Sequence, residues 1–132
     1  MTTYRIGEAA DLLGVSVDTV RRWVDSGRLV AGRDDHGHRA IAGVDLAGFA
    51  RSLGDDPDPG SRRSSARNRL PGIITAITRD SVMAQVDIQA GPFRVVSLMS
   101  REAVDELGLE VGSTAVAVIK STTVVVERGD DK

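Results

Sequence analysis

The chain has 132 residues, of which 41% are hydrophobic and 27% are charged, a balance typical of folded globular proteins. It contains no cysteine, which excludes disulfides, thiolate catalysis and cysteine-based zinc sites. No apolar run approaches the roughly 18 residues that span a bilayer, and the N-terminus lacks the pattern of a secretory signal. We therefore expect a cytoplasmic protein that does not enter a membrane. The net charge is −2, so any contact with nucleic acid must come from a local basic patch.

The composition changes abruptly around one polar segment. Residues 54–65 read GDDPDPGSRRSS, which contains no apolar residue and cannot propagate a helix or a strand. Apolar residues recur at helical spacing before this segment, and they alternate or cluster in valine-rich runs after it. We therefore predict an α+β chain with two domains: a helical domain at 1–53, a flexible linker at 54–64, a β-barrel at 65–128 and a disordered tail at 129–132.

The first half predicts two short helices joined by a tight turn. Apolar residues at positions 6, 9, 10 and 13 share one face of the first helix, which Gly14 ends through its freedom to adopt positive φ. Ser16 is the expected N-cap of the second helix. The apolar stripe of that helix consists of Val17, Val20 and Val24. A turn this short is typical of helix-turn-helix motifs, so the second helix is the candidate reader of DNA.

A small β-wing and a third helix are expected next. The loop at 33–39 is polar and is flanked by two short apolar pieces, Leu29–Val30 and Ala40–Ile41, which we expect to form the strands of the wing. The inward face of the third helix is predicted to consist of Leu46, Phe49, Ala50 and Leu53.

The second half predicts five strands and one short helix. The strands are expected at 73–78, 82–88, 93–99, 114–119 and 123–126, and one or two helical turns at 100–106. An OB-like closed five-stranded barrel is the most economical arrangement, because closure removes exposed strand edges.

Three segments of the first half resemble the winged helix-turn-helix of MerR-type and excisionase-like proteins: Tyr4–Ala10, Gly14–Trp23 and Gly37–Arg39. The resemblance implies a recognition helix in the major groove of double-stranded DNA and a wing arginine at the phosphate backbone. The chain lacks the long C-terminal dimerisation helix of many MerR regulators, so dimerisation has to come from elsewhere. The candidate DNA contacts are Thr19, Arg21 and Arg22 on the second helix, His38 and Arg39 on the wing, and Arg5.

The second half resembles the molybdate-binding Mop or TOBE domain. The matching residues are Ser65–Asn68 with Leu70 and Gly72, Leu107–Leu109 with Gly112, and Ile119–Ser121. The resemblance implies that a tetrahedral oxyanion, molybdate or alternatively tungstate, binds at the interfaces of a homo-oligomer that is either a dimer or a hexamer. The implied ligand positions are Ser65, Ala66 through its backbone, Arg67, Ser100, Lys120 and Ser121.

These residue types suit the ligand, because molybdate is a dianion whose oxygens only accept hydrogen bonds, and a selective pocket should contain only donors. We expect a molybdate-responsive DNA-binding transcriptional regulator. Two alternatives stay open: an intracellular molybdate storage protein whose helical domain is an interaction module, and an architectural DNA-binding protein whose barrel only oligomerises. An enzyme is not expected, since the chain shows no nucleophile with a partner base and no phosphate loop. His36 and His38 alone make a weak case for a metal site.

Overall fold

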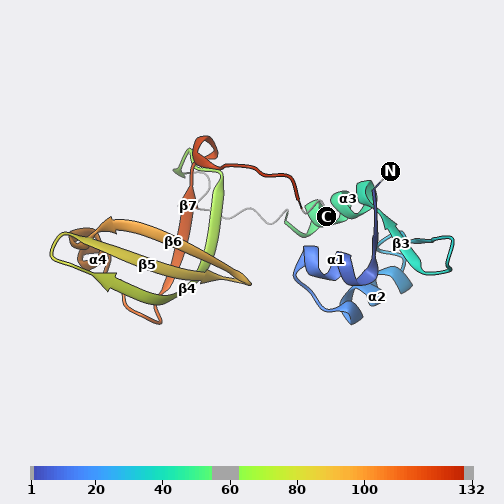
Figure 1. Ribbon diagram of the computed structural model, residues 1–132, viewed down its shortest axis with the longest axis horizontal. Coiled ribbons are helices and arrows are strands. Elements are labelled where there is room, and N and C mark those ends of the chain that lie inside the picture. The colour runs from blue at the N-terminus through green and yellow to red at the C-terminus, as the bar shows by residue number, and fades with distance from the viewer. Residues whose placement is uncertain (1, 55–62, 130–132) are drawn as a thin grey trace. The chain divides into compact units, whose positions relative to one another are not determined.

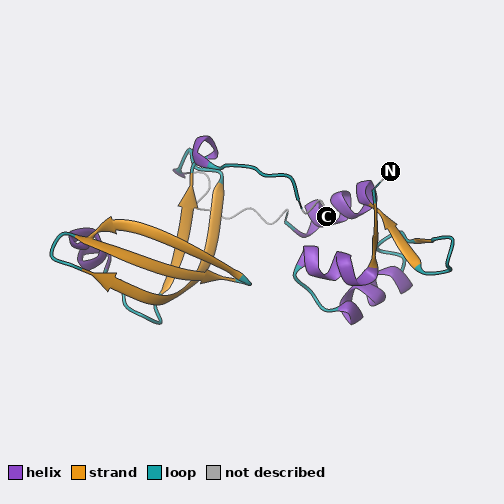
Figure 2. Ribbon diagram, in the orientation of Figure 1, coloured by secondary structure: helices purple, strands orange, loops and turns teal. Residues whose placement is uncertain are grey.

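The computed structural model describes residues 2–54 and 63–129 and divides the chain into two compact units, Met1–Pro57 and Asp58–Lys132 (Figure 1). Most of the predicted linker at 54–64 and of the predicted tail at 129–132 lies outside the described residues. None of the described helices is long and apolar enough to cross a membrane. Helices combine with antiparallel sheets, as the α+β prediction requires (Figure 2).

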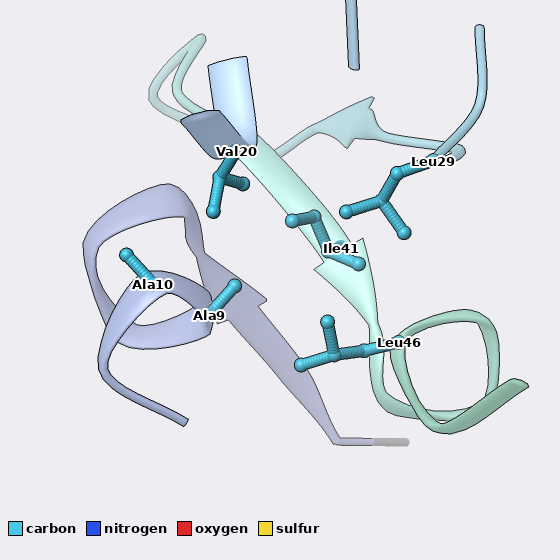
Figure 3. Close-up of a cluster of buried hydrophobic side chains, with 6 residues drawn as sticks. All are labelled: Ala9, Ala10, Val20, Leu29, Ile41 and Leu46. Carbon is cyan, nitrogen blue, oxygen red and sulfur yellow. The ribbon is translucent and has the colours of Figure 1, made fainter. Parts of the chain in front are cut away.

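The first unit consists of three helices and a small antiparallel sheet. Its elements are β1 (Thr3–Arg5), α1 (Ile6–Leu13), α2 (Val17–Asp25), β2 (Gly32–Arg33), β3 (Arg39–Ala42) and α3 (Gly43–Leu53). The sheet has the order β1-β3-β2. All three helices, β3 and the segment after α2 send side chains into one core, which Figure 3 shows: Ala9, Ala10, Val20, Leu29, Ile41 and Leu46.

The turn between α1 and α2 confirms the predicted caps. Gly14 adopts a left-handed conformation with φ of 68°, and its N–H donates to the carbonyls of Ala10 and Asp11. Ser16 is the N-cap of α2, and its hydroxyl accepts a hydrogen bond from the backbone N–H of Thr19 at 3.1 Å. Two local interactions therefore fix where one helix ends and the next begins.

Other details of the first unit differ from the prediction. The strand that pairs with β3 in the wing-like hairpin is Gly32–Arg33, and Leu29–Val30 is not a strand. Leu29 is instead buried in the core. Val17 and Leu53 are 38% and 44% exposed and do not point fully inward. Helical periodicity identifies the apolar stripe of a helix, but it does not show how far the partner elements cover its ends.

The second unit consists of one curled antiparallel sheet and a short helix. Its elements are β4 (Asn68–Arg79), β5 (Met83–Ala90), β6 (Phe93–Ser100), α4 (Arg101–Leu107), β7 (Thr114–Ile119) and the 3-10 turn η2 (Ser121–Thr123). The strand order is β6-β5-β4-β7. The core consists of Ile74, Ala84, Val86, Ile88 and Val104, the last from α4.

Strand β4 is twelve residues long because it pairs with both β5 and β7. The register shifts between Ile74 and Ala76, and such a bulge bends a strand. A Cβ atom at Gly72 would overlap the carbonyl oxygen of Gln89 on β5. A glycine is therefore required where β4 passes from one partner strand to the other.

The prediction of a fifth strand at 123–126 is wrong for the single chain. Residues 121–123 form η2, and the three valines that follow belong to no described strand. Their exposed fractions are 45% for Val124, 86% for Val125 and 85% for Val126. A valine-rich run favours extended backbone but does not specify a pairing partner, so the sheet has four strands and ends at β6 and β7.

Candidate functional site

The polar side of α2 is exposed and partly organised by local contacts. The Thr19 hydroxyl lies 2.8 Å from Ser16 Oγ and accepts a hydrogen bond from Arg22 Nη2 at 3.4 Å. The Arg21 guanidinium lies 3.8 Å from Asp18 Oδ1, and both side chains are more than half exposed. Contacts this exposed hold the side chains weakly. Arg21 and Arg22 can therefore reorient toward an external anion.

The loop between β2 and β3 is organised by Asp34. Its Oδ1 accepts the backbone N–H groups of His36 and His38, each at 2.9 Å, and its Oδ2 lies 3.8 Å from His38 Nδ1 and 3.9 Å from Arg5 Nη2. The His38 N–H is the main reason why the pKa of Asp34 lies below its usual value. The structure thus brings Arg5 to the loop that carries His38. Sequence reasoning missed Asp34, although an aspartate whose carboxylate accepts the backbone N–H two residues later is a known turn signal.

Arg39 has a partner that the sequence did not reveal. Its Nη1 donates to Asp25 Oδ1 at 2.6 Å, and its side chain is only 33% exposed. Asp25 is the last residue of α2, so the ion pair ties β3 to the end of that helix. A phosphate contact by Arg39 would therefore compete with a carboxylate already in place.

The segment before β4 forms a compact turn around Ser64. The Ser64 hydroxyl accepts the Ala66 N–H at 3.1 Å, and its carbonyl oxygen accepts Arg67 Nη1 at 3.0 Å. Ala66 is 3% exposed, whereas Ser65 and Arg67 are exposed. The buried alanine anchors the turn, so the two polar side chains stay at the surface. The Ala66 N–H, expected to contact an anion, is occupied by Ser64 in this conformation.

Strand pairing places five of the six predicted anion-binding residues at one end of the sheet. Asn68 at the start of β4 pairs with Ile119 at the end of β7, and its side-chain amide donates to the Ile119 carbonyl at 3.0 Å. The turn at 65–67 therefore lies beside Lys120 and Ser121, where η2 begins (Figure 1). Asn68 was part of the recognised motif, but its role as the clasp of this end was not anticipated.

The charges at this end of the sheet are unbalanced. Within residues 63–129, no described ion pair involves Arg67 or Lys120. Both side chains are exposed, as are the hydroxyl-bearing residues Ser65 and Ser121. Two cations and two hydroxyl groups thus lie at this end of the sheet, and neither cation makes an ion pair within the described residues. Such a group favours an anion with several acceptor oxygens.

Ser100, the sixth predicted residue, lies elsewhere in the chain. It ends β6 and pairs with Met83, close to where Arg79 ends β4, so it lies at the opposite end of β4 from Asn68. Its hydroxyl caps α4 by accepting the Ala103 N–H at 3.1 Å. The structure therefore does not bring Ser100 together with the other five residues within one chain, and Figure 1 shows α4 far from η2.

Arg101, beside Ser100, is held by the chain itself. Its Nη1 donates to the carbonyl of Asp80 at 3.2 Å, and its N–H donates to the carbonyl of Val82 at 2.8 Å. The Asp80 carboxylate accepts the N–H groups of Met83 and Val82, which lower its pKa. Arg101 thus supports the turn between β4 and β5.

In the part of the chain that the structure describes, no three histidine, aspartate or glutamate residues cluster as metal ligands would.

Comparisons with known proteins match both units. The TOBE domain model matches residues 64–126, and the MerR family regulatory protein model matches residues 5–41. Over 63 residues the chain is 40% identical to molybdenum-pterin-binding protein 3 of Clostridium pasteurianum, a match that covers 47% of this chain and 93% of that protein. It is 49% identical over 63 residues to a probable molybdenum-pterin-binding protein of Haemophilus influenzae, covering 47% and 91%.

A longer relative shares more of this chain. The molybdenum transport protein ModE of Herbaspirillum seropedicae is 39% identical over 82 residues, which cover 61% of this chain but only 28% of ModE. Among solved structures, MopII from Clostridium pasteurianum is 36% identical and covers 49% of this chain and 98% of that chain, with a TM-score of 0.47. The chain belongs to the TOBE-domain family and carries a MerR-family region ahead of its TOBE domain.

Proposed function

We propose that the chain is a cytoplasmic, non-enzymatic transcriptional regulator that binds double-stranded DNA and responds to molybdate. The observation that carries this proposal is the pair of cations, Arg67 and Lys120, gathered with two serine residues at the joined ends of β4 and β7. The MerR-family match of the other unit supports the DNA-binding half, and the relative named as a molybdenum transport protein supports the molybdate half.

The proposed ligand follows from the donors. Arg67 offers a planar fork of N–H groups, Lys120 offers a compact charge, and the hydroxyl groups of Ser65 and Ser121 can turn toward a tetrahedral ion from several directions. Relatives matched over nearly their whole length are named for binding molybdenum-pterin. Molybdate is therefore the first ligand to test, with tungstate as its closest analogue and sulfate as the smaller competitor.

The site proposed here is completed by a second subunit. Desolvating a dianion is costly, so a tight site should enclose the ion, whereas the four polar residues of this group are exposed on one chain: Ser65, Arg67, Lys120 and Ser121. Ser100 of a neighbouring subunit would supply a further hydroxyl. The proposed assembly is a homo-oligomer, a dimer or a hexamer, that binds through the TOBE units. Molybdate should stabilise this assembly by mass action.

On the DNA side, we propose a winged helix-turn-helix in which α2 enters the major groove and the loop at 34–38 is the wing. Arg21 and Arg22 are exposed on α2, and Arg5 and His38 meet at the wing. These cations would contact phosphate or guanine, so binding should weaken steeply as salt rises.

The oxyanion half is tested by isothermal titration calorimetry of the full chain with molybdate, with sulfate as the size control. Arg67→Ala should lower the molybdate affinity about 10- to 100-fold, as expected for losing charged hydrogen bonds. Arg51→Ala, an exposed arginine of α3, is the matched control and should bind as the parent does. Equal binding by Arg67→Ala and the parent would refute the assigned site.

DNA binding separates the regulator from molybdate storage, which the nearly full-length matches to molybdenum-pterin-binding proteins would also fit. The parent and an Arg21→Ala, Arg22→Ala double variant should be compared in selection from random duplexes, with and without molybdate. A regulator selects a sequence that the double variant loses, and molybdate changes its affinity. If the parent selects no sequence in either condition, storage is the better account.

A further inference from the structure

The loop at 34–38, between β2 and β3, is ordered by hydrogen bonds instead of by packing. It consists of two aspartates, two histidines and a glycine, none of which has an apolar side chain. Asp34 is half-buried, and the other four residues are exposed. A loop without apolar contacts keeps one conformation only where its polar groups bond to each other. Asp34 is therefore the inner residue around which this loop is built.

Asp34 holds the loop through its backbone and through its carboxylate. Its N–H donates to the His38 carbonyl at 2.8 Å, and its own carbonyl accepts the Gly37 N–H at 3.0 Å. Its Oδ1 accepts the N–H groups of His36 and His38, each at 2.9 Å. A substitution at Asp34 keeps the two backbone bonds but removes the two bonds to Oδ1. The carboxylate is thus the part of the residue that fixes the loop from His36 to His38.

The second carboxylate oxygen of Asp34 brings together two cationic side chains from different elements. Oδ2 lies 3.8 Å from His38 Nδ1 and 3.9 Å from Nη2 of Arg5, the last residue of β1. Both separations are longer than a hydrogen bond, and the two side chains are 59% and 60% exposed. Their N–H groups therefore stay open to another anion. With the loop in this shape, Arg5 and His38 can donate to one phosphate group together.

A carboxylate beside a phosphate is unfavourable, so Asp34 and Asp35 should affect DNA binding in opposite ways. The loop N–H groups, first of all that of His38, keep the pKa of Asp34 below its usual value, so Asp34 is charged at neutral pH. Asp35 is exposed and makes no ion pair within the described residues. It can only repel phosphate, whereas Asp34 also organises the loop that carries the donors.

We propose that Asp34 is a positioning residue of the DNA-binding unit, which holds the loop at 34–38 in the shape that lets Arg5 and His38 reach the same backbone phosphate. The inference rests on the proposed DNA binding and adds to it the residue that organises the wing. Asp34 itself contacts no phosphate. It favours binding because a loop that is ordered beforehand loses less conformational entropy when the complex forms.

The first test is fluorescence anisotropy of the full chain with a duplex that the parent selects, at several salt concentrations. Asp34→Ala should lower the affinity about 10-fold, because two hydrogen bonds that order the loop are lost. The slope of log affinity against log salt should decrease by about one, since one phosphate contact is lost. Asp34→Asn should bind close to the parent, because its amide oxygen still accepts both N–H groups. Asp35→Ala, the matched control, should bind slightly more tightly than the parent.

The signs of these changes decide the outcome. Equal rises in affinity for Asp34→Ala, Asp34→Asn and Asp35→Ala would show that Asp34 acts only through its charge, and would overturn the inference alone. An unchanged affinity and salt slope in Asp34→Ala would do the same. A parent that selects no duplex would refute the proposed function and the inference together, so the two failures are distinguishable.

The second test needs no DNA and measures hydrogen exchange of the His36 and His38 amides by nuclear magnetic resonance. Both amides should exchange slowly in the parent and in Asp34→Asn, and faster in Asp34→Ala. Unchanged exchange in Asp34→Ala overturns the proposal. The fluorescence of Trp23, which packs against the core of the first unit, establishes that each variant is folded.

A double-mutant cycle tests whether Asp34 acts through the two donors. In a chain that already carries Arg5→Ala and His38→Ala, the further change Asp34→Ala should have little effect on DNA affinity, because the donors that it positions are gone. A full 10-fold loss in that background would show that Asp34 acts through other residues, and would overturn the proposal.

Discussion

The two units complete their interiors in different ways. In the first unit, helices α1, α2 and α3 and strand β3 close one core, and Val20 and Ile41 have no measurable exposure. In the second unit the sheet ends at β6 and β7 on an open groove, and the valines at 124–126 lie in solvent. The first unit covers its core within a single chain, whereas the second leaves an apolar groove and a run of valines exposed.

The candidate sites follow the same division. The DNA-binding candidates of the first unit lie on α2, on the loop between β2 and β3 and on the adjoining strands, where Asp34 and Asp25 hold them within one chain. The anion-binding candidates of the second unit are divided between the two ends of β4. A surface that recognises DNA can be presented by each subunit alone, but a site that encloses a small dianion gains from walls on two chains.

The largest expected effect breaks the core of the first unit. Ile41→Ala should lower its free energy of unfolding by about 2–5 kcal/mol, because the side chain is buried and its removal leaves a cavity. A loss of that size is comparable with the whole stability of so small a unit. Denaturant unfolding of the full chain, followed by the fluorescence of its single tryptophan, Trp23, measures the loss.

Val44→Ala is the matched control, since Val44 is 77% exposed and its truncation should change stability by less than about 0.5 kcal/mol. If the two units fold independently, Ile41→Ala should leave the molybdate affinity of the second unit unchanged. If molybdate binding were lost together with the fold of the first unit, the two units would not be independent, and the comparison would fail.

A second prediction asks whether the anion site is shared between chains. Arg67→Ala and Ser100→Asp should each abolish most molybdate binding, the second because aspartate keeps the N-cap of α4 but repels a dianion. When the two variants are refolded together in equal amounts, about a quarter of the sites should combine an intact Arg67 with an intact Ser100 from another chain. Calorimetry of the mixture measures that fraction.

A site built within one chain would give no recovery in the mixture, since every chain carries one defect. The control mixes parent chains with Arg67→Ala chains, which should recover about half of the sites in either arrangement. Recovery near a quarter in the first mixture would therefore establish the shared site, and none would assign all of the ligands to one protomer.

The difference between local and long-range contacts explains which features could be predicted from the sequence. Local signals were sufficient for the turn between α1 and α2, where Gly14 and Ser16 act on residues at most four positions away. The meeting of Arg67 and Lys120 required the pairing of β4 with β7, which joins positions about fifty residues apart, and only the family motif pointed to it. The prediction of a fifth strand was wrong for the same reason, because β-propensity does not specify the strand with which a segment pairs. The Arg39–Asp25 pair is also nonlocal and left no pattern.

A smaller effect is expected when the ion pair between Arg39 and Asp25 is removed. Asp25→Ala removes a carboxylate from the end of α2 and frees Arg39 to contact phosphate, so DNA affinity should rise several-fold at low salt. Fluorescence anisotropy with a selected duplex at two salt concentrations measures the change. Asp35→Ala, an exposed carboxylate of the loop that makes no described ion pair, controls for the loss of one negative charge. A fall in affinity for Asp25→Ala alone would show that the pair positions the wing instead of competing with DNA.

The smallest effect concerns acid stability of the second unit. Asp87 on β5 is nearly buried, and Arg94 on β6 donates to its Oδ2 through Nε at 2.8 Å and Nη2 at 2.6 Å. The Arg94 hydrogen bonds, helped by one from Gln85, lower the pKa of Asp87. A carboxyl whose pKa is lower in the folded than in the unfolded chain stabilises the fold at pH values above its unfolded-state pKa. This contribution disappears as the pH falls through the folded-state pKa. The free energy of unfolding of the second unit should therefore decrease as the pH drops below about 4, near the ordinary pKa of aspartate.

Asp87→Asn should be less stable at neutral pH and should lose less stability on acidification, which far-ultraviolet circular dichroism can follow from pH 7 to pH 2. Parallel losses in parent and variant would mean that the ion pair between β5 and β6 contributes nothing to the sheet that presents the open edge.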